Sequence, residues 1–140
     1  MIAILAFVLA LAQSVAVQAP NEKLNLEIAD TFNAREYGLM FRTHLEPHAG
    51  MIFVFPGNAR QTFWMKNTLI PLDMIFVRAN GTVDTIAADV PASTAQTPGE
   101  TITRTGYGKF VIELAAGEAK RAGLHTGLRL TIPRLEPRDP

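Results

Sequence analysis

The most chemically suggestive part of the sequence is segment 61–73, in which an aromatic ring and a positive charge stand two positions apart. If residues 61–66 form a strand, Trp64 and Lys66 project to the same face, because successive side chains of a strand alternate between faces. An indole offers a flat apolar surface with one hydrogen-bond donor, and an ammonium offers charge. The pair could form a platform for a ligand. Alternatively, Trp64 could fill the core while Lys66 keeps only its charged end in water.

Two arginines are candidates for holding an anionic group. Arg35 and Arg42 are seven positions apart, which is two turns of a helix, so their side chains would share one face. A guanidinium can bind carboxylate or phosphate through two parallel donors. The structural alternative is that either arginine pairs with Asp73 or Glu113 and fixes the helix to the rest of the domain.

Polar side chains follow Trp64 along the chain. Asn67 and Thr68 stand in an expected loop, and Asp73 opens the next apolar run. They could line a polar pocket, or they could satisfy the backbone of an irregular loop through local hydrogen bonds. A binding site built from this region would be lined by Arg42, Trp64, Lys66, Asn67 and Asp73.

Glu113 is a lone carboxylate in the apolar run 110–114. It could be an acid whose pKa is raised by burial, or it could belong to an ion pair. A carboxylate pair of the glycosidase type is possible only between residues that are distant in the sequence, such as Asp73 and Glu113. In a further alternative, the protein is an enzyme acting on cell-envelope or extracellular material, with Asp73 or Glu113 as its acid or base.

Metal and cofactor chemistry has little support. The thioether and imidazole groups suited to Cu(I) cluster at Met40, His44, His48 and Met51. Because Pro and Gly residues interrupt that stretch, we expect core methionines and loop histidines and no metal site. The sequence has no His-Glu-x-x-His pattern, no Walker A motif and no dinucleotide fingerprint, so we expect no cofactor. Ser93, the only serine after residue 20, lacks the context of a nucleophile elbow.

The composition indicates one domain with a balanced surface. The 140 residues include 13 basic and 13 acidic side chains, so no basic stripe is available for nucleic acid, and we expect none as a partner. The chain has no cysteine, which excludes disulfides and thiol chemistry. Its stability must come from a packed core, and we expect a monomer.

The first residues are typical of a signal peptide. The run 2–12 is apolar throughout, and it is too short to span a membrane as a helix, which needs about 20 residues. Small residues place the cleavage near residue 16 or residue 19, so residues 1–19 form the expected signal peptide. The mature protein would be periplasmic or secreted, without further contact with a membrane. An uncleaved anchor is the alternative, because no Lys or Arg precedes the apolar run.

The remaining elements are mostly strands. Period-two patterns and turn signals predict about seven of them, at 24–28, 51–55, 61–66, 74–78, 82–87, 110–114 and 128–132. Asn80-Gly81 predicts a hairpin, and residues 91–100 predict a loop. Short helices are expected from Thr31 or Asn33 to Arg42 and at 117–122, with a polar, Pro-rich tail at 134–140. The fold class is mainly β: an antiparallel β-barrel or barrel-like sandwich with two short helices, spanning 20–133.

Several segments together resemble the DUF192 family of often secreted bacterial and archaeal proteins. They are 35–42, 50–55, 63–73 and 111–117, with the stretch from Trp64 to Asp73 the most specific. The resemblance implies a compact barrel-like β fold, no established activity and no accepted catalytic residues. The chain departs from the family pattern at Phe32, where proline is usual, and at Leu128, which follows Gly127 in place of aspartate.

These observations favour a non-catalytic ligand-binding module outside the cytoplasm. Its ligand would be a sugar-like or anionic small molecule, or a component of the cell envelope. A structural or interaction domain without a small-molecule site is the first alternative, and the envelope enzyme using Asp73 or Glu113 is the second.

Overall fold

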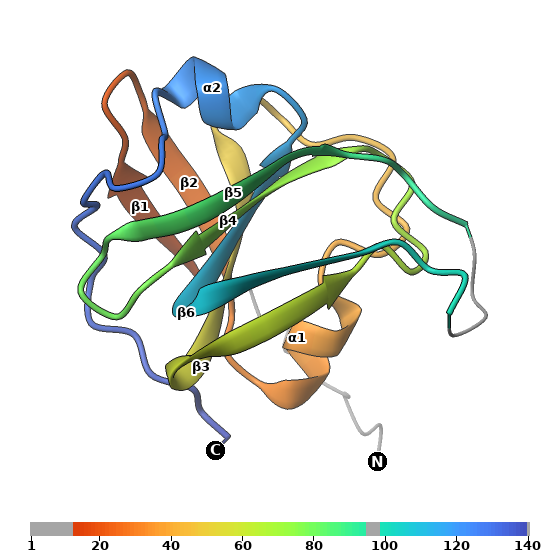
Figure 1. The fold of residues 1–140 in the computed structure, drawn as a ribbon, viewed down its shortest axis with the longest axis horizontal. Coiled ribbons are helices and arrows are strands. Elements are labelled where there is room, and N and C mark those ends of the chain that lie inside the picture. Colours follow the sequence, from red (N-terminus) through yellow and green to blue (C-terminus); the bar gives the residue numbers. More distant parts are fainter. Residues whose placement is uncertain (1–12, 95–98, 140) are drawn as a thin grey trace, which may run out of the picture.

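The strands of the molecule form one sheet. The computed structural model describes residues 13–94 and 99–139, and the six strands of this part of the chain lie in the order β1-β2-β3-β6-β4-β5 (Figure 1). Neighbouring strands are antiparallel except β2 and β3, which are parallel. The strands are β1 Ser14–Gln18, β2 Lys23–Ala29, β3 Ala49–Trp64, β4 Leu72–Val77, β5 Val83–Val90 and β6 Thr103–Ala115, and the helices are α1 Phe32–Tyr37 and α2 Glu118–Ala122.

The longest pairing joins β3 to β6 at the centre of the sheet. Residues 51–54 of β3 are all buried, which agrees with the expected central strand there. The expected break at 56–58 is wrong, because β3 continues through it with a shift of register between Val54 and Ala59. Pro56 has no N–H to give to a strand ladder, and a bulge is where a strand tolerates such a residue. Two expected strands are therefore one.

The outer halves of β3 and β6 fold back over the inner halves. Phe63, near the end of β3, packs edge-to-face on Phe53 in the first half of the same strand, with 4.7 Å between ring centres. Phe63 also contacts Phe76 of β4, at 6.2 Å. Gly106 of β6 permits this curl, since a Cβ there would lie 2.2 Å from the Phe76 ring. The sheet wraps around part of its core but does not close, and β1 and β5 remain edge strands.

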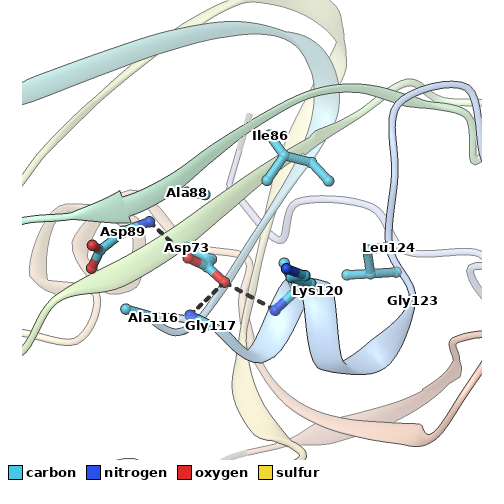
Figure 2. Close-up of a pocket in the computed structure, with 10 residues that line it drawn as sticks. Asp73, Ile86, Ala88, Asp89, Ala116, Gly117, Lys120, Gly123 and Leu124 are labelled. Atoms are coloured by element: carbon cyan, nitrogen blue, oxygen red, sulfur yellow. Dashed lines mark hydrogen bonds between the residues drawn. The ribbon is translucent and has the colours of Figure 1, made fainter.

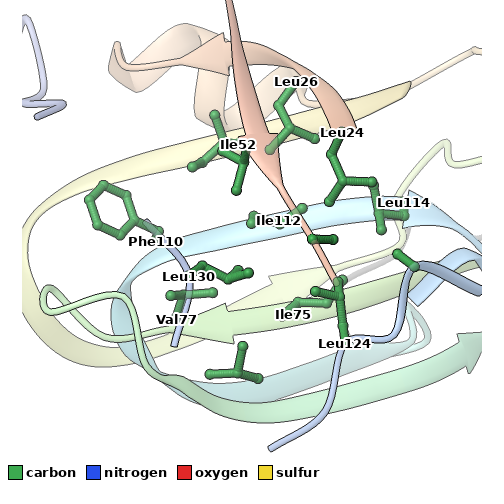
Figure 3. Packing of buried hydrophobic residues seen from close by; sticks show 14 of the residues in the cluster. Leu24, Leu26, Ile52, Ile75, Val77, Phe110, Ile112, Leu114, Leu124 and Leu130 are labelled. Carbon is green, nitrogen blue, oxygen red and sulfur yellow. The ribbon is translucent and has the colours of Figure 1, made fainter. Parts of the chain in front are cut away.

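The alternation of side chains along the central strands divides the core into two layers. In β6, Phe110 and Ile112 belong to one layer, and Val111 belongs to the other. The first layer, drawn in Figure 3, is covered by α2 and by the chain that follows it through Leu130. The second layer lies on the opposite face, inside the curl, where Leu39 covers it just after α1.

The direction of one strand pair and the number of strands differ from the expected seven antiparallel strands. β2 runs parallel to β3 because the chain crosses from one to the other through α1. Residues 128–132 form no strand but a single bridge, between Thr82 and Arg129. The mainly β class with two short helices is confirmed, whereas a closed barrel is not formed. The Asn80-Gly81 turn joins β4 to β5 in an antiparallel pair, as predicted. Of the expected loop at 91–100, residues 95–98 lie outside the described part of the chain.

The helix after β2 is shorter than predicted. Thr31 is its N-cap, and its side-chain oxygen accepts a hydrogen bond from the Ala34 backbone N–H at 3.2 Å. α1 ends at Tyr37 and not near residue 42, because Gly38 takes a φ of 50°. A Cβ at Gly38 would also lie 3.2 Å from the Phe53 ring. Glycine at this position both ends the helix and lets it approach the sheet closely.

The C-terminal segment, expected to be a polar tail, is anchored to the domain. Asp139 accepts hydrogen bonds from the Phe32 backbone N–H at 2.9 and 2.7 Å. Arg138 pairs with Asp30 at 2.9 Å. These contacts bring the end of the chain to the start of α1.

β1 coincides with the region of the expected cleavage. Val17 and Ala19 are buried in the first core layer, and β1 pairs with β2 over its whole length. A chain beginning after residue 16 would lose three of the five residues of this strand, and one beginning after residue 19 would lose all of it.

Removal of β1 tests whether cleavage can fall at those positions. A chain beginning at Pro20 should be less stable than one beginning at Gln13 by about 3 kcal/mol or more, since burying a valine side chain alone contributes about 1.5–3 kcal/mol. Denaturant melts of the two proteins give the difference. Equal stability would mean that β1 is dispensable and that cleavage near residue 16 or 19 is compatible with the fold.

Candidate functional site

The predicted site residues do not all converge. Arg42 makes a two-pronged ion pair with Glu27 of β2, with N–O distances of 2.5 and 3.1 Å. The Arg42 guanidinium donates both hydrogen bonds to Glu27, and they raise the pKa of Arg42. Both side chains are about one-third exposed. The structural alternative for Arg42 is therefore favoured, but its partner is Glu27 and neither of the two expected carboxylates.

Asp73 has a structural role on the opposite face of the sheet, beside α2 (Figure 2). Its buried carboxylate accepts a hydrogen bond from the Asp89 backbone N–H at 2.8 Å and from the N–H groups of Gly117 and Ala119 at 3.0 and 2.9 Å. It thus ties β4 to the end of β5 and to the start of α2. An open hollow of about 620 Å³ lies beside it, but both carboxylate oxygens already have partners.

The glycosidase-type pair of Asp73 and Glu113 is excluded by register. Met74 stands opposite Glu113 in the β4–β6 ladder, and Asp73 stands opposite Leu114. Residues directly opposite each other point to the same face, and adjacent residues of a strand point to opposite faces. The two carboxylates therefore lie on different sides of the sheet.

Asn67 shapes a loop. Its backbone has a φ of 52°, and its carbonyl oxygen accepts a hydrogen bond from the Phe41 N–H at 2.9 Å. Its side-chain amide approaches the Met40 sulfur at 3.9 Å. These contacts join the loop after β3 to the loop after α1.

Trp64 and Lys66 lie together, although β3 ends at Trp64 and Lys66 stands in the turn that follows it and not in the expected strand 61–66. The Lys66 ammonium nitrogen is 5.1 Å from the centre of the Trp64 ring, a cation–π contact. The indole is 40% exposed, so it is only partly used in packing. No carboxylate pairs with Lys66 in the described parts of the chain.

Hollows surround Trp64 where α1 packs against the end of β3. One of about 360 Å³ continues toward Phe55, and one of about 370 Å³ continues toward Tyr37 and Lys66. Both are bordered by Phe32 and Trp64, together with Glu36. Phe32 and Tyr37 are 61% and 56% exposed, so aromatic rings line an open surface. We name this region, formed by Phe32, Glu36, Tyr37, Trp64 and Lys66, the aromatic face.

A small cavity of about 20 Å³ lies beneath the aromatic face. Trp64, Lys66 and α1 border it, and its lining also includes Leu39, Thr68 and Glu113. Glu113 enters from the second core layer, since it stands opposite Met51 of β3 and Met74 of β4. We call this cavity the recess.

Glu113 is the unusual group in the recess. Its residue is 4% exposed, and no hydrogen-bond or ion-pair partner is found for it within residues 13–94 and 99–139. Burial disfavours the charged form and raises the pKa of the Glu113 carboxyl from 4.5 to about 8. At neutral pH the recess therefore contains an uncharged carboxylic acid.

Arg35 holds α1 in place beside this site. It donates to the Val54 carbonyl at 3.2 Å, stacks over Phe55 at 5.4 Å and approaches Asp139 at 3.5 Å. Phe32, Glu36 and Tyr37 were not among the predicted site residues. Glu36 and Tyr37 follow Phe32 by four and five positions, and this helical spacing was the signal that the sequence offered. The spacing does not reveal which face of the helix meets Trp64.

The histidines make local contacts. His44 pairs with Glu46 at 2.8 Å, and His48 pairs with Glu22. Among the described residues there is no group of three or more His, Asp or Glu side chains that could hold a metal ion. In the same residues no helix is long and apolar enough to cross a membrane.

The fold and the site define a small domain with one open, curled β-sheet and an aromatic face over a buried acid. The chain belongs to the DUF192 family (Uncharacterized ACR, COG1430), whose model matches residues 14–132. The match begins with β1, so the first strand is part of the family domain.

Two solved structures have the same fold. A protein of Sinorhizobium meliloti 1021, provisionally described as a transcription regulator, is 36% identical with a TM-score of 0.71, over 86% of this chain and 93% of that chain. A protein of unknown function from Novosphingobium aromaticivorans DSM 12444 is 34% identical with a TM-score of 0.69, over 86% of this chain and 85% of that chain. No curated protein matches the sequence.

The structural role of Asp73 is tested by Asp73→Ala, with Arg42→Ala as the control. The first variant leaves three backbone N–H groups without their acceptor, and each buried unpaired donor costs about 1–3 kcal/mol. We expect a loss of at least about 3 kcal/mol, against less than about 1 kcal/mol for the half-exposed Arg42 pair. Urea melts measure both. Similar losses would contradict these assignments.

The protonation state of the Glu113 carboxyl is tested by the substitution Glu113→Gln. Between pH 4.5 and about 8 the folded protein keeps a proton that the unfolded chain has released, so stability falls as the pH rises through this window and levels off above it. Within this window the free energy of unfolding falls by about 1.4 kcal/mol per pH unit. Denaturant melts from pH 5 to pH 9 should show that the wild type loses this stability relative to Glu113→Gln. Parallel profiles would mean that Glu113 does not hold a proton in the fold.

Proposed function

We propose that the protein is an exported, non-catalytic module that binds a small hydroxyl-bearing or anionic ligand on its aromatic face. The observation that carries this proposal is the partly exposed Trp64 ring, bordered by hollows of about 360 and 370 Å³. It is accompanied by Lys66, which has no carboxylate partner among the residues that the structure describes. An exposed aromatic ring beside hydrogen-bonding groups is suited to the flat apolar side of a sugar ring.

The site that supports this proposal is smaller than the one expected from the sequence. Trp64 and Lys66 remain in it. Arg42 and Asp73 have partners elsewhere in the fold, and Asn67 braces the loop beneath. The site is also bordered by three residues of α1, which are Phe32, Glu36 and Tyr37.

Other functions have less support. An exposed patch of this kind argues against a purely structural role for Trp64, since packing alone does not require an exposed ring. The enzyme alternative loses its carboxylate pair because Asp73 faces the other side of the sheet. Nucleic-acid binding is disfavoured, because the 13 basic and 13 acidic residues balance and a basic stripe is the expected footprint of a nucleic-acid binder.

Export is part of the proposal and rests on the apolar run 2–12. A processing site that preserves the domain has to precede Ser14, since β1 belongs to the sheet. Intact-mass analysis of the protein recovered from its native host should therefore give a chain that begins before Ser14, found outside the cytoplasm. A full-length cytoplasmic product would overturn the export proposal.

The single tryptophan allows a direct test of binding. Because Trp64 is the only Trp of the chain, its fluorescence reports on the aromatic face without interference. We expect a neutral or acidic sugar to change this emission and to raise the melting temperature, since a ligand that binds only the folded state stabilises it.

The matched variants are Trp64→Ala, and Lys120→Ala at the hollow beside Asp73. By calorimetry, Trp64→Ala should weaken the binding of the same sugar at least about tenfold, which is about 1.4 kcal/mol. Lys120→Ala should leave it unchanged. Undiminished binding by Trp64→Ala would contradict the proposal.

A further inference from the structure

The recess beneath Trp64 has room for one oxygen atom of a ligand. Its volume of about 20 Å³ is close to the minimum of about 10–15 Å³ that holds a single water molecule. Half of its lining residues are apolar, including Leu39, Phe53 and Phe63, and the other half carry polar or charged groups. A guest in such a cavity needs polar partners that are not already engaged elsewhere in the fold.

Glu113 provides the partner inside. It is 96% buried and has no other partner in the described chain. As a neutral acid it presents one O–H donor. Thr68 also borders the recess, but its hydroxyl donates to the Lys66 carbonyl at 3.2 Å. The group that satisfies Glu113 is therefore an oxygen that accepts a hydrogen bond.

Lys66 provides a positive charge at the border. It lines both the recess and the hollow beside Tyr37, and its ammonium has three donors. A donor inside and a cation at the border together favour an acceptor that carries negative charge. A carboxylate fits, because one of its oxygens can enter the recess while the other faces Lys66.

We propose that the recess is a carboxylate subsite, in which the Glu113 acid donates a hydrogen bond to one ligand oxygen and Lys66 balances the ligand's charge while the ligand's ring lies on Trp64. This inference rests on the proposed function and narrows its ligand to a sugar acid, a pyranose ring with a carboxylate. A hydrogen bond from an acid to a carboxylate is short and strong, and in the buried recess it is shielded from water.

The other charged and titratable groups around Glu113 come from α1. They are Arg35, which is engaged with Asp139 and the Val54 carbonyl, and Glu36 and Tyr37 on the exposed side of the helix. β3 and β4 present uncharged side chains to it, which are Met51, Phe53, Phe63, Trp64 and Met74. A change in affinity around pH 8 is therefore assigned to Glu113 only if it disappears when Glu113 is replaced.

The test measures the binding of D-glucuronate to the 140-residue protein by calorimetry, with D-glucose and D-glucose 6-phosphate as comparisons. At pH 7, glucuronate should bind at least about tenfold more tightly than glucose or the phosphorylated sugar. Ionised Glu113 would repel the ligand, so the affinity for glucuronate should fall about tenfold between pH 7 and pH 9, as the protonated fraction of an acid with a pKa of about 8 does.

Two substitutions distinguish the hydrogen bond that Glu113 donates from the space that its side chain fills. Glu113→Gln keeps a donor of the same length, so it should bind glucuronate within about threefold of the wild type at pH 7 and lose the pH dependence. Glu113→Met fills the same space without a donor and should bind at least about tenfold more weakly. Circular dichroism of both variants confirms that they are folded.

The outcomes distinguish this inference from the proposed function. Equal binding of glucose and glucuronate, both weakened by Trp64→Ala, overturns the carboxylate subsite and leaves the binding module standing. Equal binding of the phosphorylated sugar, or undiminished binding by Glu113→Met, also overturns the subsite. No binding of any of the three sugars overturns both proposals.

Discussion

The pairing of β3 with β6 is the contact on which the rest of the molecule depends. It is the longest ladder of the sheet and stands between the pair β1-β2 and the pair β4-β5. Its register shift after Val54 lets the two strands bend together. Without that bend, Phe63 could not reach Phe53, and the end of β3 would not bring Trp64 over the second core layer.

The bend also explains why an acid is buried. Glu113 lies in the inner half of β6, between β3 and β4, where hydrogen-bonded strands flank it on both sides. Its side chain faces the interior of the curl, and α1 and the segment after β3 cover it. Burying a carboxyl without a hydrogen-bond partner lowers the stability of the fold, and the chain holds this group as a neutral acid. A buried group that lowers stability in this way is characteristic of sites with a role other than packing.

The opposite face of the sheet shows how a carboxylate is accommodated when its role is structural. Asp73 has three backbone donors at hydrogen-bonding distance, and they connect three separate elements. The two carboxylates stand in adjacent strands, on opposite faces. Asp73 is fully paired beside α2, and Glu113, beneath α1, has no partner in the described part of the chain. That difference in pairing, more than residue type, distinguishes a structural acid from a candidate binding group.

Local patterns in the sequence determined the mainly β class and the Asn80-Gly81 hairpin, and they limited the cap of the first helix to Thr31 or Asn33. Each of these depends on neighbours a few positions away, which is why a single sequence suffices. The tertiary structure alone decided that β2 is parallel to β3, that residues 56–58 form a bulge, and that residues 14–18 are a strand. It also decided that Arg42 meets Glu27, and that Glu113 lies in the recess near Trp64 while Asp73 does not. The physical reason is that register and strand order are set by the sum of contacts between distant segments, and a shift of one residue turns every side chain to the other face.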